Sequence, residues 1–324
     1  MPYKGNHMER LIRGASKINI QENIVYFAFV IVVIFFIFTL GDRFLSVVNI
    51  LNIARQTAII SIMAVAMTFV IASGQIDLSV GSIAALSSLV VALCLRETDS
   101  LVLSVLVGLF VGTLIGATNG LLATKVGVPA FLVTLGMMGI AKGLAMWITN
   151  TMAVPIMDKD YNVIFGLGTV AGIPILLIWT AVVLIAGVFV MHQTPFGKKI
   201  LAVGGNETGA RYSGINVERV KMLAMCLTGA AAAFAGILYA GRMQAGRFTF
   251  GEGDELTVIA AVVLGGTNLY GGTARVVGAV VGSLLIGVIN NGLIILGLSV
   301  SQQIIVRGMI VILAAALGLS ARKR

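Results

Sequence analysis

The sequence has little charge and few of the residues from which metal and nucleotide sites are built. Only 11% of its 324 residues are charged, and it contains two histidines and two cysteines. His7 and His192 lie in unrelated polar stretches, so no metal site is expected. The G-x-x-x-x-G-K-[ST] loop that holds nucleotide phosphates is missing, because the fragment Gly197-Lys198-Lys199 lacks both its glycine spacing and its hydroxyl. These absences predict that the chain is no enzyme and does not bind ATP itself.

Apolar residues are what the sequence has in excess. They make up 58% of the chain, and the mean hydropathy is +1.04, more than a soluble domain of this size can cover with polar surface. Apolar runs of about 17–25 residues match the thickness of a bilayer when they are helical. They lack the alternation of barrel strands. The sequence therefore predicts an all-α, polytopic membrane protein.

The apolar runs and the basic residues together predict a topology. About ten spans are expected, with both termini in the cytoplasm. Fourteen of the 22 basic residues then lie on the cytoplasmic side and five outside, as Lys and Arg in short loops favour. We divide the chain into a cytoplasmic N-terminal segment, a transmembrane domain with a cytoplasmic loop at 192–221, and a cytoplasmic tail. These parts cover residues 1–23, 24–320 and 321–324.

The loop at 192–221 is the longest polar and basic segment between apolar runs. Within it, Asn206 is placed to cap a helix, and Glu207 follows where an acid favours the helix dipole. Gly214 supplies a stop for this helix. A short helix at the membrane surface is suited to docking a partner. The alternative is a solvated loop that only satisfies the positive-inside rule.

Two glycine-interrupted segments place polar groups at membrane depth. Asp77 lies in Ser73–Ser82 (SGQIDLSVGS), which predicts a broken or re-entrant helix, and Glu252–Gly266 again sets acids before a short apolar run. Such interruptions in corresponding places of two halves are typical of binding or gating regions in transporters. Alternatively, Asp77 caps a half-helix and serves only the fold. Candidates for a substrate path or gate are Gln75, Asp77, Ser79, Asn290 and Asn291. For the two asparagines, a hydrogen bond to a neighbouring helix is favoured over contact with a solute.

Glycines recur every four residues in the predicted span 101–124. They are Gly108, Gly112, Gly116 and Gly120. This spacing leaves one helix face almost bare of side chains and predicts close packing against a neighbouring helix.

Several motifs, in order and over nearly the whole chain, resemble the permease subunits of bacterial ABC importers for ribose, xylose, arabinose and related sugars. They are Gly74–Ser88, Pro129–Met138, Ala202–Lys221, Glu255–Gly282 and Ile289–Ser299. The resemblance implies a permease in the bacterial inner membrane, paired as a homodimer or heterodimer, with a separate ATPase subunit and a periplasmic sugar-binding protein. ATP and Mg would bind only to the ATPase, and no nucleic acid is involved.

The resemblance also assigns a role to the cytoplasmic helix, as a coupling helix that fits a groove on the ATPase. The residues it implicates are Gly205, Asn206, Glu207, Thr208, Arg211, Ser213, Gly214 and Ile215. It does not name the sugar, because specificity is expected in the binding protein. Two other hypotheses remain at this point: an ion-coupled secondary sugar transporter that uses Asp77, and a passive channel.

Overall fold

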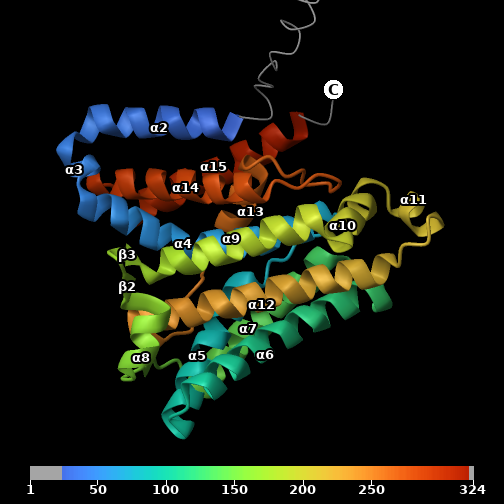
Figure 1. Cartoon of the computed structure of the whole chain (residues 1–324), viewed down its shortest axis with the longest axis horizontal. Helices are drawn as coiled ribbons and strands as arrows, with labels where there is room; N and C mark the ends of the chain where they lie inside the picture. The colour runs from blue at the N-terminus through green and yellow to red at the C-terminus, as the bar shows by residue number, and fades with distance from the viewer. Residues whose placement is uncertain (1–23, 321–324) are drawn as a thin grey trace, which may run out of the picture.

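The chain is a helical bundle in the computed structural model, which describes residues 24–320 (Figure 1). The segments 1–23 and 321–324, both predicted to be cytoplasmic, lie outside the described residues. The helices are α2 (Ile24–Leu40), α3 (Asp42–Leu45), α4 (Val47–Ala72), α5 (Val80–Thr98), α6 (Leu101–Leu121), α7 (Ala130–Thr149), α8 (Lys159–Asn162), α9 (Ile175–Gln193), α10 (Pro195–Gly205), α11 (Glu207–Tyr212), α12 (Val217–Met243), α13 (Asp254–Leu264), α14 (Val276–Ile295) and α15 (Val300–Ser320). Two π-helical turns, η1 (Leu122–Val126) and η2 (Val163–Leu167), follow α6 and α8.

Four two-residue strands are the exception to the predicted all-α fold. β1 (Val154–Pro155) pairs antiparallel with β4 (Ala245–Gly246), and β2 (Thr169–Val170) pairs with β3 (Ile173–Pro174). The β1–β4 pair joins two loops that are far apart in the sequence, which the apolar pattern could not show. The protein is therefore mostly helical rather than purely helical.

Seven described helices are long and apolar enough to cross a membrane. They are α4, α5, α6 extended by η1, α7, α9, α12 and α14. Shorter apolar helices cover Val25–Leu40 and Val300–Leu313. The short apolar run within Glu252–Gly266 forms α13, whose 11 residues reach only about 16 Å, half the thickness of the hydrocarbon core. The predicted count of about ten full spans is therefore not confirmed, and the cytoplasmic termini stay a prediction.

The bundle has two distinct ends. In Figure 1, α10 and α11 project from one end, hereafter the α11 end, while α8, β2 and β3 lie at the opposite end, the β end. Helix α12 runs between them and, with 27 residues, is about 40 Å long, more than the hydrocarbon core requires. It therefore carries the chain from the projecting α11 across the bundle.

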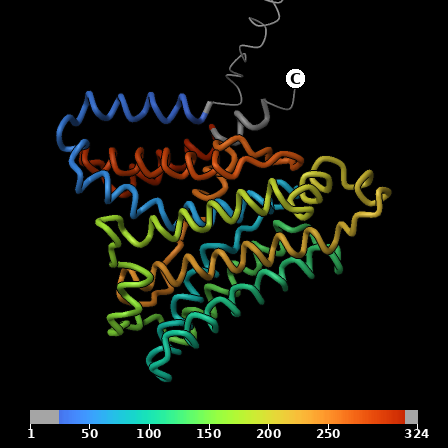
Figure 2. The backbone as a smooth tube through the Cα atoms, viewed as in Figure 1, coloured from blue at the N-terminus to red at the C-terminus, as the bar shows by residue number. Residues whose placement is uncertain are grey.

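The core lies around α4, which is the most buried of the long helices (Figure 2). Only 22% of the apolar stretches of α6 and of α9 is buried inside the protein, although both are strongly apolar. Exposed side chains such as Phe110 and Ile185 suit lipid rather than water. The structure thus buries α4 in protein and turns α6 and α9 outward.

The glycines of α6 bring its backbone against α12, as the four-residue spacing predicted. A Cβ added at Gly112 would lie 2.6 Å from the Gly229 carbonyl oxygen, and one at Gly116 would overlap the Met225 carbonyl oxygen. There is no room for any side chain at either position. By contrast, nothing lies within 4 Å of a Cβ added at Gly136 on the exposed face of α7.

We predict that Gly116→Ala lowers the free energy of unfolding by roughly 1–3 kcal/mol, because the α6 and α12 backbones must separate to admit the methyl group. Thermal unfolding of the detergent-solubilised protein measures the effect. Gly136→Ala is the matched control and should not lower the melting temperature. Equal melting temperatures for the two variants would contradict the close packing of α6 on α12.

Candidate functional site

The segment that projects at the α11 end begins with α10, a helix that the sequence analysis did not predict. Thr194 caps it by accepting a hydrogen bond from Gly197 N at 3.4 Å, and Pro195 occupies its first turn. At its far end, a Cβ on Gly204 would overlap the Ala72 carbonyl oxygen and lie 2.6 Å from Gly272 N. Gly272 N itself donates to Ala72 O at 3.0 Å. The root of the projecting segment therefore rests on the end of α4 and on the turn before α14.

The short helix α11 begins and ends where the sequence predicted. Asn206 Oδ1 accepts a hydrogen bond from Gly209 N at 2.8 Å, and Glu207 lies in the first turn. After Tyr212 the chain reaches Gly214, whose φ of +80° is the left-handed conformation that ends many helices. Both capping predictions are confirmed. The eight residues implicated in coupling are exposed, except for Ile215, which is half-buried.

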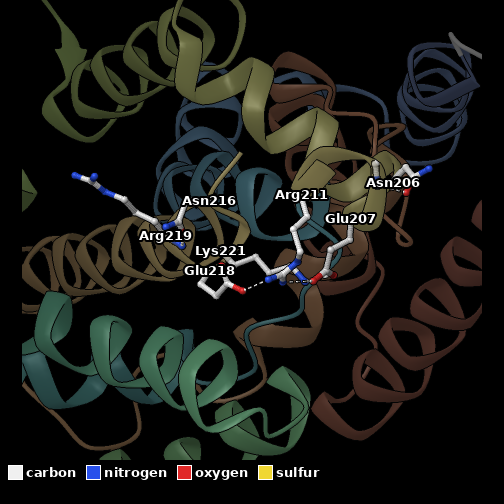
Figure 3. A network of polar contacts seen from close by, with 8 residues as sticks. Asn206, Glu207, Arg211, Asn216, Glu218, Arg219 and Lys221 are labelled. Atoms are coloured by element: carbon white, nitrogen blue, oxygen red, sulfur yellow. Dashed lines mark hydrogen bonds and ion pairs between the residues drawn. The ribbon is translucent and has the colours of Figure 1, made fainter. Parts of the chain in front are cut away.

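Ion pairs fix α11 to the start of α12 (Figure 3). Arg211 lies 3.6 Å from Glu207 and 2.6 Å from Glu218, and Lys221 lies 2.6 Å from Glu207. Arg219 points away from this network in the close-up view. A single exposed ion pair contributes only about 0–1 kcal/mol, but a connected set holds the two helices in one orientation. Arg211 is thus occupied within the chain.

One exposed residue of α11 was missed by the sequence analysis. Tyr212 is 89% exposed, more than any other large apolar side chain of the described residues. A tyrosine in an otherwise polar and charged loop was the available signal, because aromatic side chains are enriched where one protein binds another.

The predicted helix break lies between α4 and α5, and Asp77 is fully buried in it. Its Oδ1 accepts hydrogen bonds from Ser79 N at 2.9 Å and Ser79 Oγ at 2.6 Å, and its Oδ2 accepts one from Thr228 Oγ1 at 3.1 Å. Asn119 Nδ2 in turn donates to Ser79 Oγ at 2.9 Å. Both carboxylate oxygens have partners from the chain itself. This arrangement fits the interpretation that Asp77 serves the fold, by joining the break to α6 and α12.

The two glycine-interrupted segments, only weakly similar in sequence, meet in space. A Cβ on Gly81 would lie 2.8 Å from Glu255 Oε2. It would also overlap the carbonyl oxygen of Gly251, which directly precedes Glu252–Gly266 and has a φ of +70°. The start of α5 and the loop before α13 are therefore in direct backbone contact. Helices α5 and α13 both begin beside this contact, and interrupted helices of this kind are found at the binding regions of transporters.

Asn290 and Asn291, the path candidates on α14, lie far from the helix break. Asn291 Nδ2 donates to Asn49 Oδ1 at 2.9 Å, which ties α14 to the beginning of α4 and fits a packing role. Gln75, Asp77 and Ser79 follow the other end of α4, a helix about 39 Å long. The structure therefore does not bring Asn290 and Asn291 together with the helix break. Gln75 and Ser79 are buried as well.

Comparison with known proteins agrees with this architecture. The family model described as the permease component of branched-chain amino acid transport systems matches residues 49–315. The chain belongs to this permease family. It is 41% identical to the ribose import permease protein of Bacillus subtilis (strain 168), over 89% of each chain.

The permease has further relatives among sugar transport systems. It is 40% identical to the ribose import permease protein of Escherichia coli (strain K12), over 88% of this chain and 89% of the relative. It is 32% identical to the xylose transport system permease protein of the same organism, over 96% and 95%. No solved structure matches the chain. The protein is thus a multi-pass membrane protein and the transport subunit of an ABC transporter.

For Asp77 we predict that hydrogen bonding matters more than charge. Asp77→Ala removes the acceptor for Ser79 and Thr228 and should lower the free energy of unfolding by roughly 1.5–3 kcal/mol, the range for hydrogen bonds to a charged group. Asp77→Asn keeps one oxygen and can donate to Thr228, so it should retain most of the stability. Thermal unfolding in detergent measures the stability of both variants. The control is Asp160→Ala, because Asp160 is exposed. An Asp77→Asn variant that folds normally but has lost uptake would contradict the structural role.

Proposed function

We propose that the permease is the membrane subunit of an ATP-driven importer that passes a sugar into the cytoplasm. The observation that carries this proposal is a capped, exposed α11 held rigidly on α12, in a chain 32–41% identical to ribose and xylose permeases over most of its length. The α11 end then faces the cytoplasm of a bacterial inner membrane, as the basic residues of 192–221 indicate. ATP and Mg bind to a separate ATPase subunit.

In this proposal, α11 is the coupling helix. Closure of the ATPase on ATP displaces α11, and the ion pairs to Glu218 and Lys221 carry that displacement into α12. The contact of Gly204 with Ala72 and Gly272 carries it into α4 and the turn before α14. Tyr212 is the anchor of this interface, because an exposed aromatic side chain that enters a pocket contributes much of an interface's binding energy.

The β end receives the sugar from a periplasmic binding protein. Loops 150–173 and 242–255 form this receiving surface, and the β1–β4 pairing joins them. Hollows of about 310 and 640 Å³ flank the joined loops, on either side of Met157. Tyr161 anchors the surface, because its hydroxyl donates to Ile237 O at 2.9 Å, and burial raises the pKa of this hydroxyl well above its usual range. Two copies of the permease, or this chain and a related one, enclose the path.

The ion-coupled alternative is not favoured. A carboxylate that binds a transported ion must become accessible, whereas Asp77 is fully buried and both its oxygens are hydrogen-bonded within the chain. An ion-coupled carrier also gives no role to the exposed α11.

We predict that Tyr212→Ala weakens association with the ATPase by about 2 kcal/mol, the loss typical of a truncated anchor residue. The measurement is co-purification of the ATPase with the tagged permease from detergent-solubilised membranes, with ATPase activity assayed in the eluate. Arg211→Glu is less informative, because it also breaks the ion pairs within the chain.

Met157→Ala is the matched control for Tyr212→Ala. Met157 is 84% exposed but lies among the loops of the β end, so its truncation should leave ATPase capture unchanged. Equal capture by both variants would remove α11 as the docking element. A clean permease with no ATPase, together with uptake driven by an ion gradient, would overturn the importer itself.

A further inference from the structure

A cavity of about 180 Å³ opens where the two interrupted segments meet. The start of α5, the middle of α7 and the loop before α13 form its walls. The lining side chains that carry polar or aromatic groups are Ser82, Lys142, Phe248, Phe250, Glu252 and Glu255. The path residues predicted from the sequence, Gln75, Asp77 and Ser79, do not line it.

The cavity lies at membrane depth. Lys142 is in the 20-residue apolar helix α7, about 18 Å along the axis from Ala130 and about 10 Å from Thr149. Its Nζ lies 3.0 Å from Glu252 Oε1, yet the two side chains are 38% and 63% exposed. Charged groups exposed to hydrocarbon at this depth are costly and are normally turned toward protein or a water-filled path. The opening beside Lys142 therefore faces water or a polar molecule rather than lipid.

The lining groups define the chemistry of an occupant. The carboxylates of Glu252 and Glu255 accept hydrogen bonds, and the Lys142 ammonium donates them. Phe248 and Phe250 add apolar surface, and the volume is below the roughly 300–1,000 Å³ of cavities for drug-sized ligands. Two acids against one lysine disfavour an anionic solute such as a sugar phosphate. A small neutral molecule that carries several hydroxyl groups fits each of these features.

We propose that this cavity is a solute-contact site of the permease, in which Glu252, Glu255 and Lys142 hydrogen-bond the hydroxyl groups of a neutral sugar as it crosses the membrane. The site rests on the proposed importer function and adds to it the residues that the sugar touches. Its walls come from both interrupted segments and from α7. The site exists only because Gly81 and Gly251 allow the two segments to touch.

Water access to the cavity can be tested without knowledge of the sugar. Gly139 lines the cavity, and a Cβ there meets nothing within 4 Å, so Gly139→Cys fits without strain. The variant is made in full-length permease that carries Cys94→Ala and Cys226→Ala, the two native cysteines. Membranes are treated with a charged, membrane-impermeant thiosulfonate. The control is Ile185→Cys, on the exposed apolar face of α9.

Gly139→Cys should react at least about tenfold faster than Ile185→Cys, because only a thiolate in contact with water attacks the reagent. Equal, slow reaction of both cysteines would place the cavity in lipid or in dry protein and overturn the site. This result is independent of the ATPase and of the transported solute. It therefore separates failure of the site from failure of the proposed function.

The contact with sugar is tested by uptake of radiolabelled D-ribose and D-xylose in cells that contain the complete transporter. Glu252→Gln should lower the uptake rate roughly ten- to hundredfold, the effect of losing one hydrogen bond to a charged group. The control is Asp42→Asn, which removes an exposed carboxylate in the first turn of α3. It should leave uptake unchanged.

Exchanging the two charges distinguishes contact with the sugar from an ion pair that only holds α7 against the loop before α13. Lys142→Glu combined with Glu252→Lys restores an ion pair but reverses the groups that meet the sugar. Uptake should stay at the level of Glu252→Gln if the groups contact the solute. Recovery of the wild-type rate would show that the pair only holds the two segments together, and would overturn the site. A wild-type transporter that imports neither sugar would count against the proposed substrate class, while the thiol reaction still tests the site.

Discussion

Close backbone contact at glycines is the constraint on which the rest of the structure depends. Lipid chains are as apolar as leucine, so the hydrophobic effect does not drive one membrane helix against another, and close packing must contribute instead. Here α6 rests on α12 through Gly112 and Gly116, and Gly81 touches Gly251 at the two interrupted segments. Gly204 rests on Ala72 at the root of the projecting segment. The three contacts join α6 to α12, the start of α5 to the loop before α13, and α10 to the end of α4.

These contacts form a continuous route between the two candidate sites. The route starts at α11, which ion pairs fix to α12. On the other side of α11, Gly204 near the end of α10 touches the turn that contains Gly272. That turn follows α13, and the first turn of α13 carries Glu255 into the wall of the cavity. Packed backbones leave no space to absorb a displacement, so a shift of α11 would reach the cavity by movement of whole elements.

The buried polar groups divide into those that hold the fold and those that remain open. Asp77 has three hydrogen-bond donors on two elements, and Asn291 is paired with Asn49. Neither side chain is available to a solute in this structure. Lys142 also lies within an apolar helix, but its side chain and that of Glu252 are partly exposed. Depth in the membrane alone therefore did not distinguish a structural acid from a candidate contact.

The amino-acid sequence by itself determined the membrane class, the close packing of α6 and the start and stop of α11. Each follows from local physics: the length of apolar runs, the spacing of glycines, and caps such as Asn206 and Gly214 that act within a few residues. Only the tertiary structure decided that Gly81 meets Gly251, that Asp77 accepts a hydrogen bond from Thr228, and that Lys142 pairs with Glu252. These partners are separated by up to 170 residues along the chain. No local pattern specifies such contacts, because they depend on how whole helices are placed against one another.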